Sequence, residues 1–161
     1  MGNFRAYAAM VALFAAVLNA ALVIGVFGPV SLLTGLEVIP EADAGVLLGP
    51  AMVLAATLAL FAMLLSRIRI PPDEQRVAVG GALAAGVVAG VVYLVVGGLG
   101  YAWARSDPLA GFLFVGRQAA LPYVFLAAAI AAVVMFLDTL VLASRVGERG
   151  RPRWPWEHDG P

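Results

Sequence analysis

Four long apolar stretches constrain this chain more than any other feature. A bilayer core is about 30 Å thick, and a helix needs roughly 20 apolar residues to cross it. Hydrophobic residues make up 63% of the chain and charged residues only 12%, which is unusual for a soluble domain. We therefore predict an all-α polytopic integral membrane protein, a bundle of four transmembrane helices over residues 6–33, 45–66, 77–104 and 118–143.

Little chain is left outside these spans. Residues 1–146 form the predicted transmembrane domain, and residues 147–161 form a tail rich in Pro, Trp and Arg. The tail has no apolar periodicity that would support a packed fold, so we expect it to be disordered. Two interpretations of it stay open: Trp154 and Trp156 dip into the inner membrane interface, or the tail docks on a cytoplasmic partner.

The arginines are distributed unevenly between the two sides of the spans. Cytoplasmic segments close to transmembrane helices retain positive charge. All ten basic residues are Arg, and only Arg105 and Arg117 fall on the side of the first and third loops. We therefore predict that both termini are cytoplasmic. Because the absence of Lys and the abundance of Ala, Gly and Val suggest a GC-rich bacterial genome, we expect a multi-pass protein of the bacterial plasma membrane.

The first span has an alternative interpretation as a cleaved signal peptide. Arg5 followed by an apolar run is how such peptides begin. The run continues well past their usual apolar region of roughly 7 to 15 residues, and no clean A-x-A site ends it. A retained span is favoured, and the sequence leaves open whether cleavage occurs.

Several residues mark the expected ends of the spans. Asp43 precedes the second span, where a carboxylate complements the partial positive charge of a helix start. Tyr101 and Trp103 close the third span as an aromatic belt at the outer interface. Pro122 falls within the first turns of the fourth span, where a missing N–H costs least, or kinks that span slightly.

The third span carries a stripe of small residues. At about 100° per residue, seven positions fall on one helix face: Ala82, Gly86, Ala89, Gly90, Tyr93, Gly97 and Gly100. Gly86 and Gly90 form a GxxxG pair, which lets two helix backbones approach closely in lipid. The stripe predicts helix packing, inside one bundle or against a partner. Tyr93 is the exception, and we expect its hydroxyl to hydrogen-bond Asn19 or a backbone carbonyl.

One carboxylate interrupts the fourth span. Asp138 lies about 10 Å from Arg145 and roughly 30 Å from Arg117 along a helix, so the charges of Asp138 and Arg117 bracket almost one hydrocarbon thickness. An intramembrane carboxylate is a functional candidate by default. Basic partners are near, however, including Arg67 and Arg76, and no second acid is placed for a proton relay. An ion pair or polar anchor is therefore favoured over proton or cation binding.

The residue types argue against enzyme chemistry. Cysteine and lysine are absent, and His158 in the tail is the only histidine. The chain therefore has no thiol nucleophile, no His pair for a metal and no Ser-His-Asp set. We expect no catalytic residue, no cofactor or metal, and no nucleic-acid partner.

Two segments carry a resemblance to known proteins. VIPEADAGVLLGPAMV, which runs into the second span, and RGRPRWPWE in the tail resemble small four-span membrane proteins of unknown function found in actinobacteria. The resemblance covers most of the chain and implies topology and lineage. Such families have no assigned activity, so it implies no catalytic residue.

Together these features predict a small membrane protein of structural or accessory type. Besides the lipid bilayer, its partner would be a second copy or a larger membrane complex, contacted through the Gly/Ala-rich third span. The alternative is a component of a dimeric small transporter, or of an ion or proton channel, that uses Asp138. The small multidrug-resistance exporters have such a size, but they carry an acid in the first span where this chain has Asn19.

Overall fold

Five helices make up the described part of the chain. The computed structural model describes residues 2–70 and 77–146, with side chains for 5–70 and 77–144. The helices are α1 (Gly2–Thr34), α2 (Leu48–Arg67), α3 (Val79–Arg105), α4 (Pro108–Ala120) and α5 (Pro122–Val146), with no strand among those residues. All except α4 are long and apolar enough to cross a membrane. The prediction of an all-α protein with four apolar spans is confirmed.

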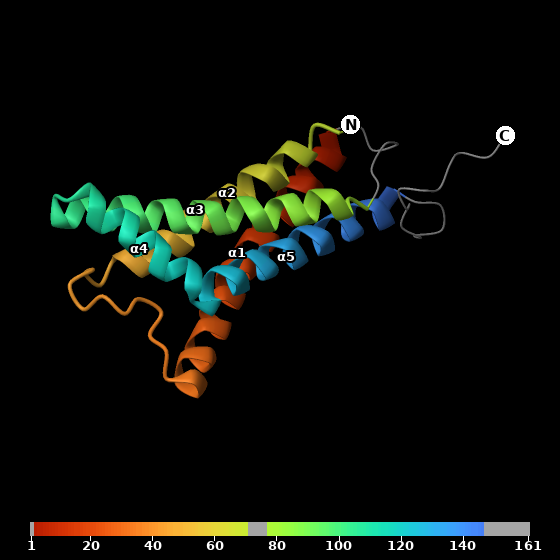
Figure 1. Ribbon diagram of the computed structural model, residues 1–161. Helices are drawn as coiled ribbons and strands as arrows, with labels where there is room; N and C mark the ends of the chain where they lie inside the picture. The colour runs from red at the N-terminus through yellow and green to blue at the C-terminus, as the bar shows by residue number, and fades with distance from the viewer. Residues whose placement is uncertain (1, 71–76, 147–161) are drawn as a thin grey trace.

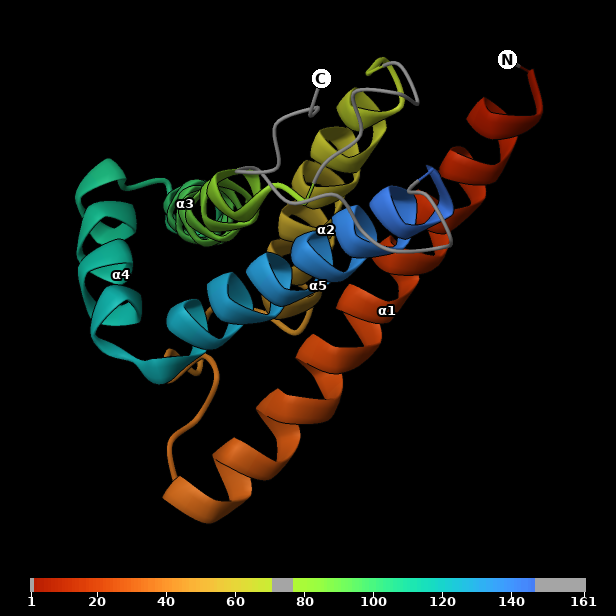
Figure 2. The same ribbon diagram turned by 90° about the vertical axis from the view of Figure 1, so that its right-hand side faces the viewer.

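α3 is the central helix of the bundle. Figure 1 shows it running the length of the molecule, with α5 along one half and α4 along the other. Gly86 and Gly90 face α5, whereas Gly98 faces α4. α2 packs on α3 as well, and α1 packs on α2 and α5. Figure 2 shows that α1 and α4 lie on opposite sides of the molecule.

The small residues of α3 pack against other helices of the same chain. Ala82 and Ala89 are buried, and a Cβ added to Gly86 would lie 2.7 Å from the carbonyl oxygen of Ala128. A Cβ at Gly97 would collide with Met52 and Phe114. Helix backbones come this close only where side chains are absent. Because α5, α2 and α4 cover the stripe, the geometry favours the intramolecular alternative over a partner interface at this face.

The region predicted as a single fourth span, 118–143, contains the end of one helix and most of another. Leu121 is extended (φ −87°, ψ 153°) because the ring of a following proline disfavours helical backbone. Pro122 is the first residue of α5, where its missing N–H costs no helical hydrogen bond. The prediction that Pro122 lies in the first turn of a span is confirmed, and the alternative of a slight kink is wrong, because two separate helices meet at Leu121. α4 has 13 residues, about 20 Å, which is too short to cross a bilayer.

The two ends of the bundle differ in what they carry. α1 begins and α5 ends at the same end, on the right in Figure 1, which we call the terminal end. The opposite end, called the loop end, carries the connection 35–47 between α1 and α2. Three predictions concern parts of the chain outside the described residues: the roles of Arg76 and of the Arg145 side chain as partners of Asp138, and the disorder of the tail 147–161.

The packing of α3 on α5 generates a stability prediction. Gly86→Ala should lower the free energy of unfolding by about 1–3 kcal/mol, because the new methyl group meets the Ala128 carbonyl oxygen and the Ala132 methyl group. Unfolding by SDS from mild detergent micelles, followed by circular dichroism, measures this change. Gly80→Ala is the matched control on the same helix, since a Cβ there meets nothing within 4 Å. Equal stability of the two variants would contradict the proposed role of the contact.

Candidate functional site

Charged contacts hold the 35–47 loop against the ends of α3 and α4. Asp43 accepts hydrogen bonds from the Tyr101 hydroxyl at 3.0 Å and from Arg105 Nη1 at 2.6 Å. Glu41 pairs with Arg117 at 3.4 Å, and the Glu41 side chain is only 5% exposed. The loop is therefore fixed to helices that follow it by about 60 to 75 residues in the sequence.

Two expectations for this end were wrong. Asp43 does not cap α2, whose N-cap residue is Leu47 and has no side-chain cap, because its carboxylate is used by Tyr101 and Arg105. Trp103 is exposed, but Tyr101 is buried and stacks on Phe114 with ring centroids 5.0 Å apart. Tyr101 therefore joins the loop to the bundle instead of belonging to a lipid-facing aromatic belt.

Buried side chains also bind the loop backbone. Gln118, at the end of α4, donates from Nε2 to the Val38 carbonyl oxygen at 3.0 Å. The Tyr123 hydroxyl, in the first turn of α5, donates to the Leu36 carbonyl oxygen. Free carbonyl groups near an apolar phase are costly, so these bonds stabilise a loop that folds back on the bundle.

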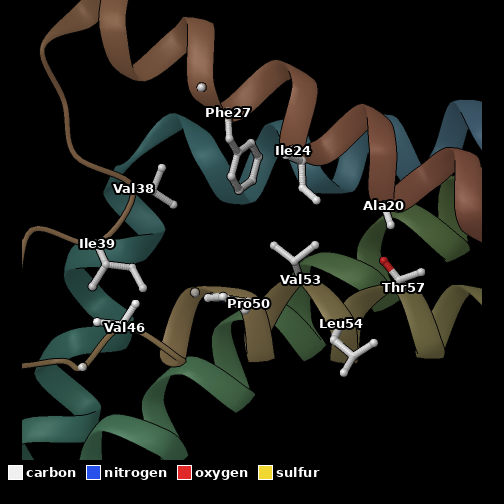
Figure 3. Close-up of a pocket in the computed structure, with 13 residues that line it drawn as sticks. Ala20, Ile24, Phe27, Val38, Ile39, Val46, Pro50, Val53, Leu54 and Thr57 are labelled. Atoms are coloured by element: carbon white, nitrogen blue, oxygen red, sulfur yellow. The ribbon is translucent and has the colours of Figure 1, made fainter.

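An apolar cavity of about 720 Å³ lies between α1, α2 and this loop. Figure 3 shows its lining side chains converging from the three segments. They are Ala20, Ile24, Phe27 and Gly28 from α1; Val38, Ile39, Gly45 and Val46 from the loop; and Gly49, Pro50, Val53, Leu54 and Thr57 from α2. Thr57 is the single polar side chain in this set.

The cavity is open at its side. Its lining residues Ile24 and Leu54 are 69% and 60% exposed. An apolar space between two helices of this kind favours hydrocarbon over water. It can therefore accommodate an apolar molecule.

A hydrogen bond ties α1 to α2 at the end of the cavity farthest from the loop. Asn19 Nδ2 donates to Thr57 Oγ1 at 3.0 Å, and both side chains are buried. In Figure 3 the Thr57 oxygen points toward α1. The predicted bond between Asn19 and Tyr93 is therefore wrong, because Asn19 faces α2. The Tyr93 hydroxyl has no hydrogen-bond partner among the described residues, and its ring meets Phe27 edge-on.

Asp138 lies at the terminal end, inside α5. It is 3% exposed, and neither carboxylate oxygen accepts a hydrogen bond from the described residues. Arg67, which ends α2, attracts this carboxylate electrostatically. Arg117, the other charge predicted to bracket the span, lies at the loop end with Glu41. The structure thus brings Asp138 close to Arg67 and leaves it far from Arg117.

The described residues offer few ligands for a cofactor. Within residues 2–70 and 77–146, no three His, Cys, Asp or Glu side chains gather where they could hold a metal ion. The polar groups described above form helix–helix and loop–helix contacts. The arrangement can therefore hold an apolar molecule in the cavity and a charge at Asp138.

Sequence reasoning missed the residues that line the cavity. Ile24, Phe27 and Val53 belong to apolar runs in which no position stands out. A weak signal was available in Gly45 and Gly49, which reduce side-chain volume where the loop enters α2. The space itself depends on the separation of α1 from α2, which no local pattern encodes.

Comparison with known proteins agrees with the resemblance of the sequence to membrane proteins of unknown function. No curated protein and no solved structure gives a significant match. A family of unknown function, DUF6121, matches residues 1–161, the whole chain. The protein thus belongs to the DUF6121 family and is a small membrane protein with four apolar helices.

Proposed function

We propose that the protein is a non-enzymatic accessory membrane protein that packs with itself or with a larger membrane complex. In this proposal both termini face the cytoplasm of a bacterium. The support comes from the sequence, because positive residues favour the cytoplasmic side. Eight of the ten arginines precede the first span, lie between the second and third spans or follow the last span, whereas only Arg105 and Arg117 lie between the third and last spans.

The observation that carries the association is an uncovered face of α1. Phe14, Leu18, Ala21 and Gly25 follow one another at helical spacing, and all four are exposed. A Cβ added to Gly25 would meet nothing within 4 Å, so packing inside this chain does not require a glycine there. A pair of small residues four positions apart on a membrane helix is typical of helix–helix association.

The spacing of the polar groups favours this role over transport. Thr57 bonds Asn19 ten residues before Arg67, about 15 Å along α2, whereas Asp138 interacts with Arg67 itself. A proton relay needs polar groups within hydrogen-bond reach of one another, directly or through water. The described side chains offer isolated polar contacts at different depths.

The α1 face generates a test by substitution. Gly25→Leu should lower self-association or partner capture at least tenfold, because a branched side chain keeps the two helix backbones apart. Energy transfer between labelled copies in liposomes measures self-association, and cross-linking in native membranes measures partner capture. Gly80→Leu is the control, since Gly80 is also exposed and uncrowded. If neither assay detects association of the wild type, or if both variants behave alike, the proposal fails.

A transporter or channel that uses Asp138 is the second candidate. The observation in its favour is a buried carboxylate without a hydrogen-bond donor among the described residues. Intramembrane carboxylates of this kind often bind protons or cations.

Asp138→Asn separates the two candidates. For the accessory role we expect wild-type proteoliposomes to lose a pH gradient no faster than empty ones. The variant should be about as stable as the wild type or more stable by about 1–2 kcal/mol, because the amide removes a buried charge whose oxygens accept no hydrogen bond, and this offsets the lost attraction to Arg67. A pH-sensitive dye and SDS unfolding provide the measurements. Rapid proton flux that the substitution abolishes in a folded protein would instead establish the second candidate.

A further inference from the structure

The cavity between α1 and α2 is placed where lipid chains can reach it. Both walls are helices long and apolar enough to cross a membrane, so the space between them faces hydrocarbon. Ile24 and Phe27 project into it from α1, opposite Val53 of α2 (Figure 3). A molecule that enters from the bilayer need not pass through water.

We propose that this cavity binds one acyl chain of a membrane phospholipid. Its volume of about 720 Å³ falls within the range of ligand sites in proteins, about 300–1,000 Å³. Thr57 is the single polar side chain in the lining, and its oxygen already accepts a hydrogen bond from Asn19. Ligands with many polar groups would lose their hydration without replacement, whereas a flexible hydrocarbon chain loses none.

Polar contacts hold the walls of the cavity in place at both of its ends. The bond between Asn19 and Thr57 holds α1 to α2 at one end. At the other end, Gln118 and Tyr123 fix the loop through the carbonyl groups of Val38 and Leu36. These bonds set the separation of α1, α2 and the loop, while the exposed lining residues Ile24 and Leu54 mark an open side through which a chain can enter from the bilayer.

The charges at the loop end are already paired with one another. Glu41 and Asp43 lie in the loop between the lining residues Ile39 and Gly45, and they bind Arg117 and Arg105. The acyl chain is therefore assigned from the apolar lining and from the place of the cavity between two membrane helices, without a headgroup contact. This inference rests on the α1–α2 cavity and does not depend on association through Gly25.

Retention of a defined lipid tests the site. The full-length protein is placed in nanodiscs of palmitoyl-oleoyl phosphatidylglycerol and released into the gas phase for native mass spectrometry. The wild type should retain one phospholipid. Val53→Trp, which fills the cavity from α2, should lower the ratio of lipid-bound to lipid-free protein at least tenfold. Ile24→Trp fills the cavity from α1 and provides a second measurement if Val53→Trp does not fold.

Val87→Trp is the matched control. Val87 is 65% exposed on α3 and does not line the cavity, so this variant should retain lipid as the wild type does. The proposal is overturned if the wild type retains no lipid, or if all three variants retain it equally. Protein purified from native membranes provides a further check, because a bound isoprenoid or another molecule without an acyl chain would overturn the assignment.

Discussion

The close contact of α3 with the broken α4–α5 pair is the constraint on which the rest of the structure depends. Where Gly86 meets the backbone of α5, no side chain separates the two helices. In lipid, such contact replaces the hydrophobic driving force that folds soluble proteins. α3 packs on α5, α4 and α2, and α1 lies at the side of this assembly, where it packs mainly on α2 and α5. That peripheral position leaves both the exposed α1 face and the space between α1 and α2.

Polar side chains connect α1 to α2 and the 35–47 loop to α3. Asn19 and Thr57 link two spans inside the membrane region, and Asp43 links the loop to the end of α3. A polar group in hydrocarbon is stable only with a partner, so these contacts fix position as well as supplying energy. Asp138 departs from this pattern, since its partner Arg67 acts through charge without a hydrogen bond to the carboxylate. It remains the residue most informative about a second activity.

Sequence patterns predicted the four spans well and their contacts poorly. Span length and apolarity are local properties, so the runs around α1, α2, α3 and α5 were recognisable. The partner of a polar side chain depends on which helices face each other. The Tyr93 hydroxyl was predicted to bond Asn19 or a backbone carbonyl, but Asn19 bonds Thr57 and the Tyr93 hydroxyl has no partner among the described residues. Pro122 was predicted to lie in the first turns of the last span or to kink it slightly, and the first alternative is correct. The separate helix α4 before it was not predicted, because a proline fixes its own backbone but does not reveal whether a helix precedes it. Of the candidate site, the interaction of Asp138 with Arg67 was predicted from sequence, whereas the cavity was not.

The sequence by itself determined that this chain is helical and apolar enough to cross a membrane four times. Those properties follow from composition and from the number of residues between charged or proline-containing segments. The tertiary structure alone decided that the glycines of α3 serve contacts within the chain, that the loop folds back onto α3, α4 and α5, and that an apolar cavity separates α1 from α2. Each of these depends on the register and tilt of helices distant in sequence, which no local pattern specifies.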